Sequence, residues 1–396
     1  MRLIHTSDWH LGRSFHQVGL LGAQASYLDH LVDVVRREKV DAVLVSGDVY
    51  DRAMPAPDTV ALLSQALQRL VDAGAQVIIS SGNHDSAARL GFGAGLLERT
   101  GVHLRTSLAD VARPVLLAGA AVYPLPYLEP SLAADALGAT ERTHAGVLRA
   151  AMDAVRADAA ARPGVPVVAM AHAFVSGGVG SESERDISVG GVSAVPPTVF
   201  AGAHYAALGH LHGAQQVAPG VRYSGSPVAM SFSEVNHRKV SLLVDLDGRS
   251  VSVESVEAPV ERPLAVLRGT LEEVLADPRH RAAESAWCQV TLTDSIRPLG
   301  AMDQVHRRFP HTLELRFDPQ GLAVPLRPYA ARAASRSDLD VCCDFLEHVR
   351  GGRAASEQER ELLAQAVEES RLARRARDDE GVAGPAADAA RTVGAA

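Results

Sequence analysis

Five short segments of the sequence carry side chains that could bind a metal ion, and each segment comes directly after an apolar run. Their candidate donors are Asp8, His10, Asp48, Asn83, His172, His210 and His212. Oxygen and nitrogen donors without cysteine favour Mn²⁺, Fe²⁺ or Zn²⁺ over a structural zinc site built from thiolates. The chemistry expected of these residues is therefore that of a divalent metal centre, and all three ions remain possible.

The apolar runs before these donors are typical of buried strands, because they are short, rich in branched side chains and bounded by polar or glycine positions. They cover residues 3–7, 42–46, 76–80, 167–171 and 205–208. Apolar residues recur at helical spacing between the strands, as over 27–35 and 60–70. This alternation predicts an α/β layered core, in which the carboxyl ends of the strands form one ligand-binding rim.

The spacing within the segments supports one shared site. Asp8-x-His10 and His210-x-His212 would each place two donors on one side of an extended segment, because side chains alternate along a strand. Gly47 and Gly82 would let the backbone turn tightly as it leaves the sheet. Each segment alone is also compatible with an ordinary turn or a buried core histidine. Five such segments, each directly after a predicted strand, would not occur together by chance.

Composition sets the class of protein. The 396 residues have a net charge of 39 − 47 = −8, which argues weakly against a general nucleic-acid binder but allows a local basic track. The cysteines Cys288, Cys342 and Cys343 cannot form a disulfide framework, so we expect a reducing compartment. His5 and Asp8 interrupt the first apolar run before a signal peptide could form, and no run reaches the roughly 18 apolar residues of a membrane span.

The order of the five segments resembles that of the calcineurin-like metallophosphoesterases: Asp-x-His, Gly-Asp-x-x-Asp, Gly-Asn-His-Asp, His, and Gly-His-x-His. Longer strings resemble the bacterial SbcD family of exonuclease subunits, and they lie at residues 4–12, 81–86, 207–212 and 223–227. The string at 223–227, followed by Ser-Phe-Ser-Glu at 231–234, discriminates best because phosphoesterases in general lack it. The likeness is strong over 1–250, loose over the two terminal helices, and limited to position and size over 261–327.

The resemblance implies a calcineurin-like β-sandwich core flanked by helices, a small α+β cap domain and two C-terminal helices, within the α/β class. The expected domains are a nuclease domain over 1–258, a DNA-capping domain over 259–330, a helical segment over 337–376 and a disordered tail over 377–396. The sequence pattern agrees with a small α+β domain, since strand-like runs at 264–267, 288–292 and 313–317 accompany a helical run at 270–275. Capping boxes at Ser337–Asp340 and Ser356–Glu359 predict the two terminal helices.

The resemblance also implies two metal ions, with manganese as the expected metal. The first would be held by Asp8, His10, Asp48 and His212, and the second by Asp48, Asn83, His172 and His210. Asp48 would bridge the ions with its two oxygens, which also offsets their mutual repulsion. His84 would bind the scissile phosphate and assist the departing 3′ oxygen. Asp51 would orient His84, or else simply cap its loop, and Asp85 could support the turn at Asn83 and His84 without a catalytic role.

The expected function is a metal-dependent DNA nuclease subunit of an SbcCD-type repair and recombination complex. It would degrade double-stranded ends and cleave single strands and hairpins by two-metal phosphodiester hydrolysis. The alternative is a metallophosphatase acting on another phosphoester. Its protein-phosphatase branch carries Arg-Gly after the second aspartate of the second motif, whereas Arg52 is followed here by Ala53. A non-catalytic scaffold that has lost ligands is disfavoured, because every ligand position is filled.

The resemblance further implies an SbcC-type ATPase as partner and a homodimer within a heterotetramer that binds DNA ends and hairpins. The helices after Pro57 and Ser86 are candidates for the dimer contact. The helices at 337–349 and 356–376 would grip the coiled coil of the ATPase, or alternatively pack on their own cap domain. The expected location is the cytoplasm, in association with the nucleoid when the enzyme acts.

Overall fold

The structure, a computed structural model, describes residues 1–187, 194–319, 337–350 and 352–379. These residues form two compact units, which we describe separately. The first comprises residues 1–267, 278–290 and 308–314, and the second comprises the described residues of 268–277, 291–307 and 315–396. Both the candidate metal ligands and the long apolar runs lie in the first unit.

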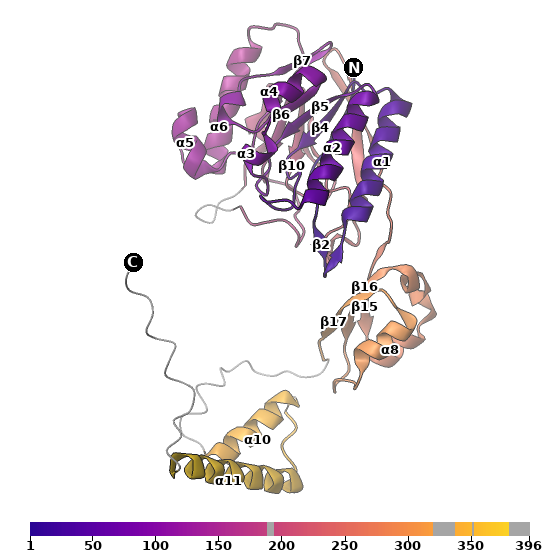
Figure 1. Cartoon of the computed structure of the whole chain (residues 1–396), viewed down its shortest axis with the longest axis vertical. Helices are drawn as coiled ribbons and strands as arrows, with labels where there is room; N and C mark the ends of the chain where they lie inside the picture. Colours follow the sequence, from indigo (N-terminus) through magenta and orange to yellow (C-terminus); the bar gives the residue numbers. More distant parts are fainter. Residues whose placement is uncertain (188–193, 320–336, 351, 380–396) are drawn as a thin grey trace. The chain divides into compact units, whose positions relative to one another are not determined.

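Two six-stranded sheets form the centre of the first unit (Figure 1). The first sheet has the order β14-β13-β1-β4-β5-β6, with bounds β1 (Arg2–Thr6), β4 (Ala42–Ser46), β5 (Gln76–Ser80), β6 (Val102–Arg105), β13 (Val240–Asp247) and β14 (Ser250–Glu257). The second has the order β11-β12-β10-β9-β8-β7, with bounds β7 (Val115–Leu117), β8 (Ala120–Pro124), β9 (Val167–His172), β10 (Tyr205–Gly209), β11 (Gln215–Ala218) and β12 (Val221–Tyr223). Neighbouring strands from β1 to β6 in the first sheet, and β8, β9, β10 and β12 in the second, run parallel.

Helices cover the outer face of each sheet (Figure 1). On the first sheet these are α1 (Leu21–Glu38) and α2 (Pro57–Asp72), and on the second they are α5 (Pro130–Leu137) and α6 (His144–Ala159). Shorter elements complete the unit: β2 (Ser14–Phe15), β3 (Val18–Gly19), α3 (Ala87–Leu90), α4 (Ala94–Leu97), and the 3₁₀ turns η1 (Glu98–Thr100), η2 (Leu108–Asp110), η3 (Pro197–Phe200), η4 (Phe232–Glu234) and η5 (Pro278–Ser285).

Side-chain alternation along the strands explains these layers. In β4, Leu44 faces the other sheet and contributes to a core with Met170 of β9, while Val43 and Val45 pack against the helices. In β9, Ala169 points the other way, into the core that contains Met152 of α6. A strand that is buried on both faces reads as a continuous apolar run. The predicted α/β sandwich with flanking helices is confirmed, and so are the five strands expected before the donors.

A three-stranded sheet of order β15-β16-β17 follows, with bounds β15 (Leu264–Gly269), β16 (Trp287–Leu292) and β17 (Thr312–Phe317). The helices here are α7 (Leu271–Ala276), whose capping box pairs Thr270 with Glu273, and α8 (Ala301–Arg308), which was not predicted from the sequence. The predicted strand runs and the helical run are confirmed. The domain limits of 259–330 stay a prediction, and residues 320–330 lie outside the described residues.

The terminal helices are α10 (Asp338–Val349) and α11 (Glu357–Asp379). The capping box at Ser356 and Glu359 has both of its bonds, at 2.8 Å and 3.3 Å. At Ser337 the amide of Asp340 donates to Ser337 Oγ at 3.2 Å, and the hydroxyl of Ser337 donates to the Asp340 carboxylate. The helix α11 includes residues 377–379, where the tail was expected to begin, and residues 380–396 lie outside the described residues. Among the described helices, none combines the length and the apolar character needed to cross a membrane.

Candidate metal centre

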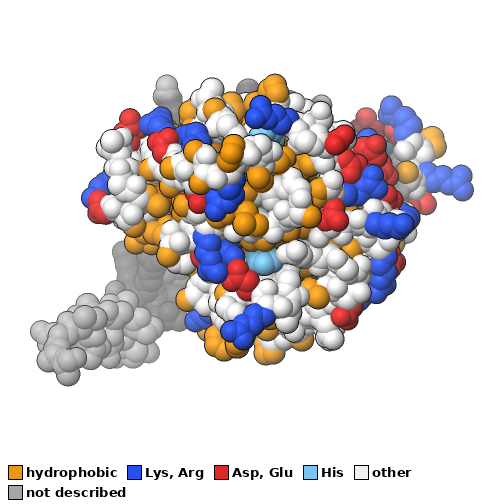
Figure 2. Space-filling view, turned by 90° about the horizontal axis from the view of Figure 1, so that it is seen from above, with side chains coloured by type: hydrophobic (Ala, Val, Ile, Leu, Met, Phe, Trp, Pro, Cys, Tyr) orange, Lys and Arg blue, Asp and Glu red, His pale blue; other side chains and the backbone are white. Residues whose placement is uncertain are grey.

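The candidate donors meet where the carboxyl ends of strands from both sheets converge. Asp8 and His10 follow β1, Asp48 follows β4, and Asn83 follows β5. From the second sheet come His172, which ends β9, and the pair after β10, His210 and His212. All of them are buried except Asn83, which is half-buried. On the face of the molecule that Figure 2 shows, histidine covers only small patches of the surface.

Two glycines allow close approaches at the site, Gly209 between the two sheets and Gly82 beside Asp48. A Cβ atom on Gly209 would lie 1.8 Å from the carbonyl oxygen of Ser46, and one on Gly82 would lie 2.1 Å from Asp48 Oδ1. Gly47 has the positive φ (+85°) expected of a tight turn, whereas Gly82 does not. Gly82 is therefore needed for space beside Asp48, which corrects the expected reason for this residue.

The backbone around the donors is strained. The φ angles of Asp8 (+53°), His10 (+43°), Asp48 (+49°) and His210 (+107°) are all positive, which costs about 1–3 kcal/mol for each non-glycine residue and is typical of functional sites. The extended geometry expected for Asp8-x-His10 and His210-x-His212 is therefore wrong. Hydrogen bonds between the loops hold this conformation, as where the amide of His210 donates to Asp8 Oδ1 at 3.0 Å.

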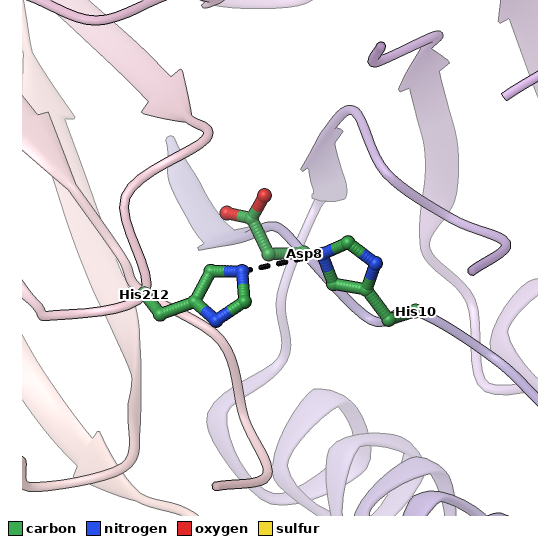
Figure 3. Close-up of side chains that lie close together, drawn as sticks. All are labelled: Asp8, His10 and His212. Carbon is green, nitrogen blue, oxygen red and sulfur yellow. Dashed lines mark hydrogen bonds between the residues drawn. The ribbon is translucent and has the colours of Figure 1, made fainter. Parts of the chain in front are cut away.

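The first donor cluster consists of Asp8, His10 and His212, whose ligand atoms lie within 4.8 Å of one another (Figure 3). The Nε2 atoms of His10 and His212 are 3.2 Å apart. His10 Nδ1 lies 3.6 Å from an Asp51 carboxylate oxygen, beyond hydrogen-bond distance, and the negative charge there favours a proton on this nitrogen. If the Nδ1 of His212 is also protonated, two nitrogen lone pairs face each other beside a carboxylate, and a shared cation removes their repulsion.

Asp48 stands between the two halves of the site. Its Oδ2 lies 3.6 Å from His10 Nε2 and 3.3 Å from His172 Nε2, whereas its Oδ1 accepts a hydrogen bond of 2.9 Å from the amide of His84. One carboxylate oxygen therefore faces both donor groups, whereas the expectation was that the two oxygens are shared between the ions. Asp48 also forms a second donor cluster with Asp8 and His172, whose ligand atoms lie within 4.8 Å of one another.

The second half of the site contains His172, Asn83 and His210. His172 Nδ1 donates to the carbonyl of Ser46 at 3.0 Å, so Nε2 is the atom that faces Asn83 Oδ1 at 2.9 Å. The ring of His210 lies edge-on to His172 at 5.3 Å between centroids. His210 belongs to none of the three donor clusters among the described residues: the two named above and a third of His10, Asp48 and His84. The structure thus brings all seven candidates together, whereas the ligand role of each of them, His210 included, stays a prediction.

Burial and mutual charge shift the titration of these groups. Burial is the largest single influence on His172 and would lower its pKa, but the charge and hydrogen bond of Asp48, together with the charge of Asp8, raise that pKa to about 9. Burial raises the pKa of Asp8 to about 6 and lowers the pKa of His10 to about 4. Buried carboxylates that resist ionisation are stabilised in the charged form by a bound cation. The donor set, its orientation and its burial therefore fit divalent metal ions.

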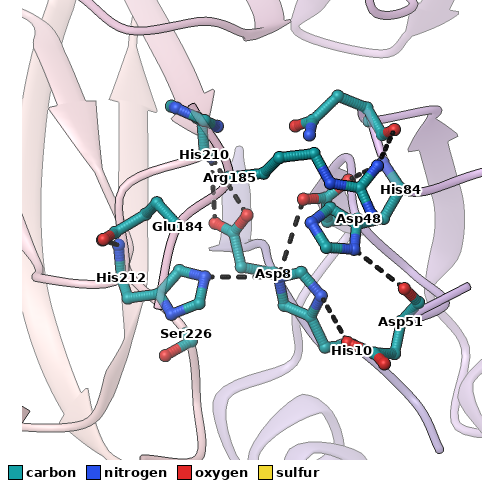
Figure 4. A network of polar contacts seen from close by, with 12 residues as sticks. Asp8, His10, Asp48, Asp51, His84, Glu184, Arg185, His210, His212 and Ser226 are labelled. Carbon is teal, nitrogen blue, oxygen red and sulfur yellow. Dashed lines mark hydrogen bonds and ion pairs between the residues drawn. The ribbon is translucent and has the colours of Figure 1, made fainter. Parts of the chain in front are cut away.

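His84 lies at the edge of the first cluster, with its ring 4.6 Å from that of His10. Its Nδ1 donates to the main-chain carbonyl of Asp51 at 2.8 Å, which leaves Nε2 for another partner (Figure 4). The Asp51 carboxylate instead pairs with Arg13 at 2.9 Å. The expectation that the Asp51 carboxylate orients His84 is therefore wrong, because the main-chain carbonyl of Asp51 makes this contact. The alternative, a simple loop cap, does not describe Asp51 either, since its carboxylate pairs with Arg13.

Further polar residues around the site were not predicted as functional. Arg185 is exposed and extends across the site toward His84, where its Nη1 donates to the carbonyl of Asn83 at 3.4 Å (Figure 4).

Behind His212 lies a buried network of Ser183, Glu234 and Lys239. Glu234 ends the Ser-Phe-Ser-Glu string at 231–234, which the resemblance had singled out without giving it a role, and Lys239 is one of only two lysines in the chain. Asp85 accepts hydrogen bonds from the amides of Val49, Tyr50 and Gly82, as suits a support of the turn.

Comparison with known proteins gives matches along most of the chain. A family model described as calcineurin-like phosphoesterase matches residues 1–212, and one described as type 5 capsule protein repressor C-terminal domain matches residues 260–350. The SbcD subunit of the nuclease SbcCD from Escherichia coli (strain K12) is 34% identical over 297 residues, covering 70% of this chain and 73% of that protein. The corresponding protein of Rhodobacter capsulatus is 35% identical over 377 residues, covering 86% and 91%. A dimetal phosphatase from Danio rerio matches with a TM-score of 0.38 and 13% identity, covering 65% of this chain and 99% of that one.

Proposed function

Since the chain belongs to the calcineurin-like phosphoesterase family, and within it to the SbcD-type DNA nuclease subunits, we propose that it hydrolyses DNA with a pair of manganese ions. The family confirms the resemblance drawn from the motifs, and it establishes a metal-dependent nuclease of the SbcCD type. The finer proposal concerns the metal, the residues and the substrates. The single observation that supports it best is Asp48 Oδ2, which faces donors on both sides of the site.

In this proposal the first ion is held by Asp8, His10, Asp48 and His212, and the second by Asp48, Asn83, His172 and His210. When bound, the two ions would make a hydroxide available near neutral pH and withdraw charge from the phosphodiester. Manganese agrees with a donor set of carboxylate, amide and imidazole groups that lacks thiolates. The strained backbone at Asp8, His10 and Asp48 keeps these donors preorganised, so that little reorganisation accompanies binding.

His84 would assist the leaving 3′ oxygen of the cleaved strand. Its Nδ1 proton is committed to the Asp51 carbonyl, so proton transfer must occur at Nε2. Burial lowers the pKa of His84, against the charge of Asp48, which raises it. A bound phosphodiester adds negative charge beside the ring and favours the protonated form that can act as an acid. The guanidinium of Arg185 is suited to hold the same phosphate, since Arg pairs with phosphate through two parallel hydrogen bonds.

The proposal extends to the assembly. We propose that the chain works with an SbcC-type ATPase, held through α10 and α11, whose apolar side chains Phe345, Val349, Leu362 and Leu372 are exposed. Such side chains are suited to cover a partner helix. An enzyme of this kind shares its compartment with the chromosome, so we place it in the cytoplasm, at the nucleoid when it acts. Its substrates would be double-stranded DNA ends, single strands and hairpins.

The deciding experiment compares substrates on one preparation. Metal-free protein is supplied with Mn²⁺ and assayed on a linear duplex, a DNA hairpin and p-nitrophenyl phosphate, alone and with the ATPase. We expect manganese-dependent degradation of the duplex from its ends and cleavage of the hairpin, with a further increase when the partner and ATP are present. Faster turnover of the phosphate monoester than of DNA would instead favour the metallophosphatase.

The homodimer is proposed to form through the surface between α2, α3 and α4. A groove of about 550 Å³ lies there, lined by apolar residues of α2 such as Leu63 and Leu67. Phe92 and Leu96, between and within the short helices, are 85% and 73% exposed. An apolar surface with a neighbouring apolar groove suits a two-fold contact, in which each copy presents both parts.

We expect Phe92→Glu to weaken this dimer at least about 30-fold, the effect of losing a central contact worth about 2 kcal/mol. Sedimentation analysis over a range of concentrations would measure the change. The matched control is Leu132→Glu on α5, because Leu132 is equally apolar and 73% exposed but lies on the opposite sheet. Equal dissociation constants for both variants would contradict the proposed surface. Metal content should stay the same in both variants.

A further inference from the structure

A buried ion pair lies directly behind His212. Glu234 and Lys239 are 2% and 7% exposed, and the Lys239 ammonium donates to Glu234 Oε2. The same ammonium donates to Ser226 Oγ at 2.8 Å and to the carbonyl of His212 at 3.3 Å. Two charges are costly to bury, and a pair of this kind often adds no net stability compared with apolar residues. A contribution to the neighbouring site would explain its presence better than stability does.

The hydrogen bonds of Ser183 determine how His212 is protonated. Ser183 Oγ lies 2.5 Å from Glu234 Oε1 and 2.8 Å from His212 Nδ1. A carboxylate can only accept, so the single hydroxyl proton of Ser183 goes to Glu234, and the oxygen accepts from His212. The Nδ1 of His212 therefore carries the proton. Its Nε2 keeps a free lone pair, which points toward His10 Nε2 at 3.2 Å.

His212 is held at its main chain as well as at its ring. Its amide donates to Glu184 Oε1 at 2.8 Å, and its carbonyl accepts from Lys239. Lys239 also compensates the charge of Glu234, which would otherwise add a third buried carboxylate near Asp8 and Asp48. These contacts thus fix the position, the rotation and the protonated nitrogen of one imidazole, and the pair of Glu234 and Lys239 does so without adding net charge to the site.

We propose that Glu234, acting through Ser183 and balanced by Lys239, is a positioning residue that presents the Nε2 of His212 to a metal ion. Carboxylates behind histidine ligands commonly act in this way, and removing them typically weakens metal binding 10–100-fold. The inference rests on the proposed function, because it takes His212 as a ligand. It goes beyond that function in assigning a role to residues outside the donor set.

The test replaces the ion pair without leaving a lone buried charge. In Glu234→Leu/Lys239→Met both charges and the acceptor for Ser183 are lost, whereas Glu234→Gln/Lys239→Met keeps an acceptor oxygen. The control is Glu257→Gln/Arg238→Met, which removes an exposed ion pair nearby. Mn²⁺ binding to the metal-free proteins is measured by calorimetry, and the His212 tautomer by ¹⁵N NMR. Thermal unfolding reports the fold of each variant.

We expect the leucine variant to bind one of two manganese ions about 10–100-fold more weakly and to populate both His212 tautomers. The glutamine variant should recover most of the affinity, and the control should match the unsubstituted protein. If the leucine variant does not fold, Ser183→Ala replaces it, with a smaller loss of affinity expected, because Glu234 Oε1 lies 3.3 Å from His212 Nδ1.

Two results would separate the inference from the function on which it rests. Unchanged affinities and a pure Nδ1-protonated tautomer in the leucine variant, with only thermal stability altered, would make the ion pair merely structural and overturn the inference. The same holds for Ser183→Ala if it is the variant tested. An unsubstituted chain that binds no manganese would contradict the proposed function itself.

Discussion

Asp48→Asn is expected to abolish binding of both ions and to lower DNA cleavage at least about a thousandfold. The reason is geometric, since Asp48 Oδ2 faces His10 on one side and His172 on the other. Each ion contributes several kcal/mol of charge stabilisation, and about 4 kcal/mol corresponds to a thousandfold in rate. Asparagine retains an oxygen that can accept from the His84 amide, so the loop should keep its conformation. Metal content after dialysis and the rate of duplex degradation would measure the two effects.

The matched control for this prediction is Asp51→Asn, three residues further along the same loop. The Asp51 carboxylate pairs with Arg13 and lies 3.6 Å from His10 Nδ1, where the side-chain oxygen of asparagine can still face this nitrogen as an acceptor. Its contact with His84 uses the main-chain carbonyl, which the substitution leaves in place. We therefore expect Asp51→Asn to retain both ions and to lose far less activity. A full pair of ions in Asp48→Asn would contradict the bridging role, and loss of both ions in Asp51→Asn would show that the loop, not the bridge, determines metal binding.

The strands that carry the donors could be predicted because their sequences have only one structural explanation. A run such as residues 42–46 is apolar on both faces, and it is buried on both faces because another sheet covers one side and helices cover the other. The polar residue that follows each run then marks the rim of the sheet. Local pattern and long-range packing agree in these segments, and the prediction needed no knowledge of the other sheet.

In other elements the local sequence pattern does not agree with the structure that packing produces. The strand β8 (Ala120–Pro124) begins with two alanines and ends in proline, so its sequence gives only a weak strand signal, and pairing with β7 and β9 makes it a strand. The helix α8 (Ala301–Arg308) was missed within a predominantly polar stretch. Helices and strands of this kind depend on tertiary contacts that no local pattern reports.

The residues of the site could be predicted as a set, but their geometry could not. Aspartate adopts a positive φ more readily than most residues, but residue type does not show that Asp8 and Asp48 do so here, because hydrogen bonds between loops impose this conformation. The contact between Ser183 and Glu234 joins residues 51 positions apart, and the sequence between them has no repeat that would reveal it. Motifs therefore identify which side chains converge, whereas tautomers and supporting contacts require coordinates.

His84→Gln is expected to leave the metal content unchanged and to slow DNA cleavage about 10²–10⁴-fold, the usual contribution of general acid catalysis. Glutamine is similar in size and can donate a hydrogen bond, but it cannot transfer a proton. The structure makes the measurement of metal content necessary, because His84 also forms a donor cluster with His10 and Asp48 within 4.8 Å. Loss of an ion in this variant would identify His84 as a ligand and contradict its assigned role.

A substrate with a better leaving group distinguishes proton transfer from simple binding of the phosphate. The 3′ oxygen of DNA leaves as a basic alkoxide and needs a proton, whereas p-nitrophenolate is stable without one. If His84 supplies the proton through Nε2, the loss in His84→Gln on bis(p-nitrophenyl) phosphate should shrink to less than about tenfold, since general acid help is no longer required. If His84 acts only by binding the phosphate, both substrates should lose the same factor, because that contact does not depend on the leaving group. The ratio of the two losses therefore measures the acid contribution of this histidine separately from its contribution to binding.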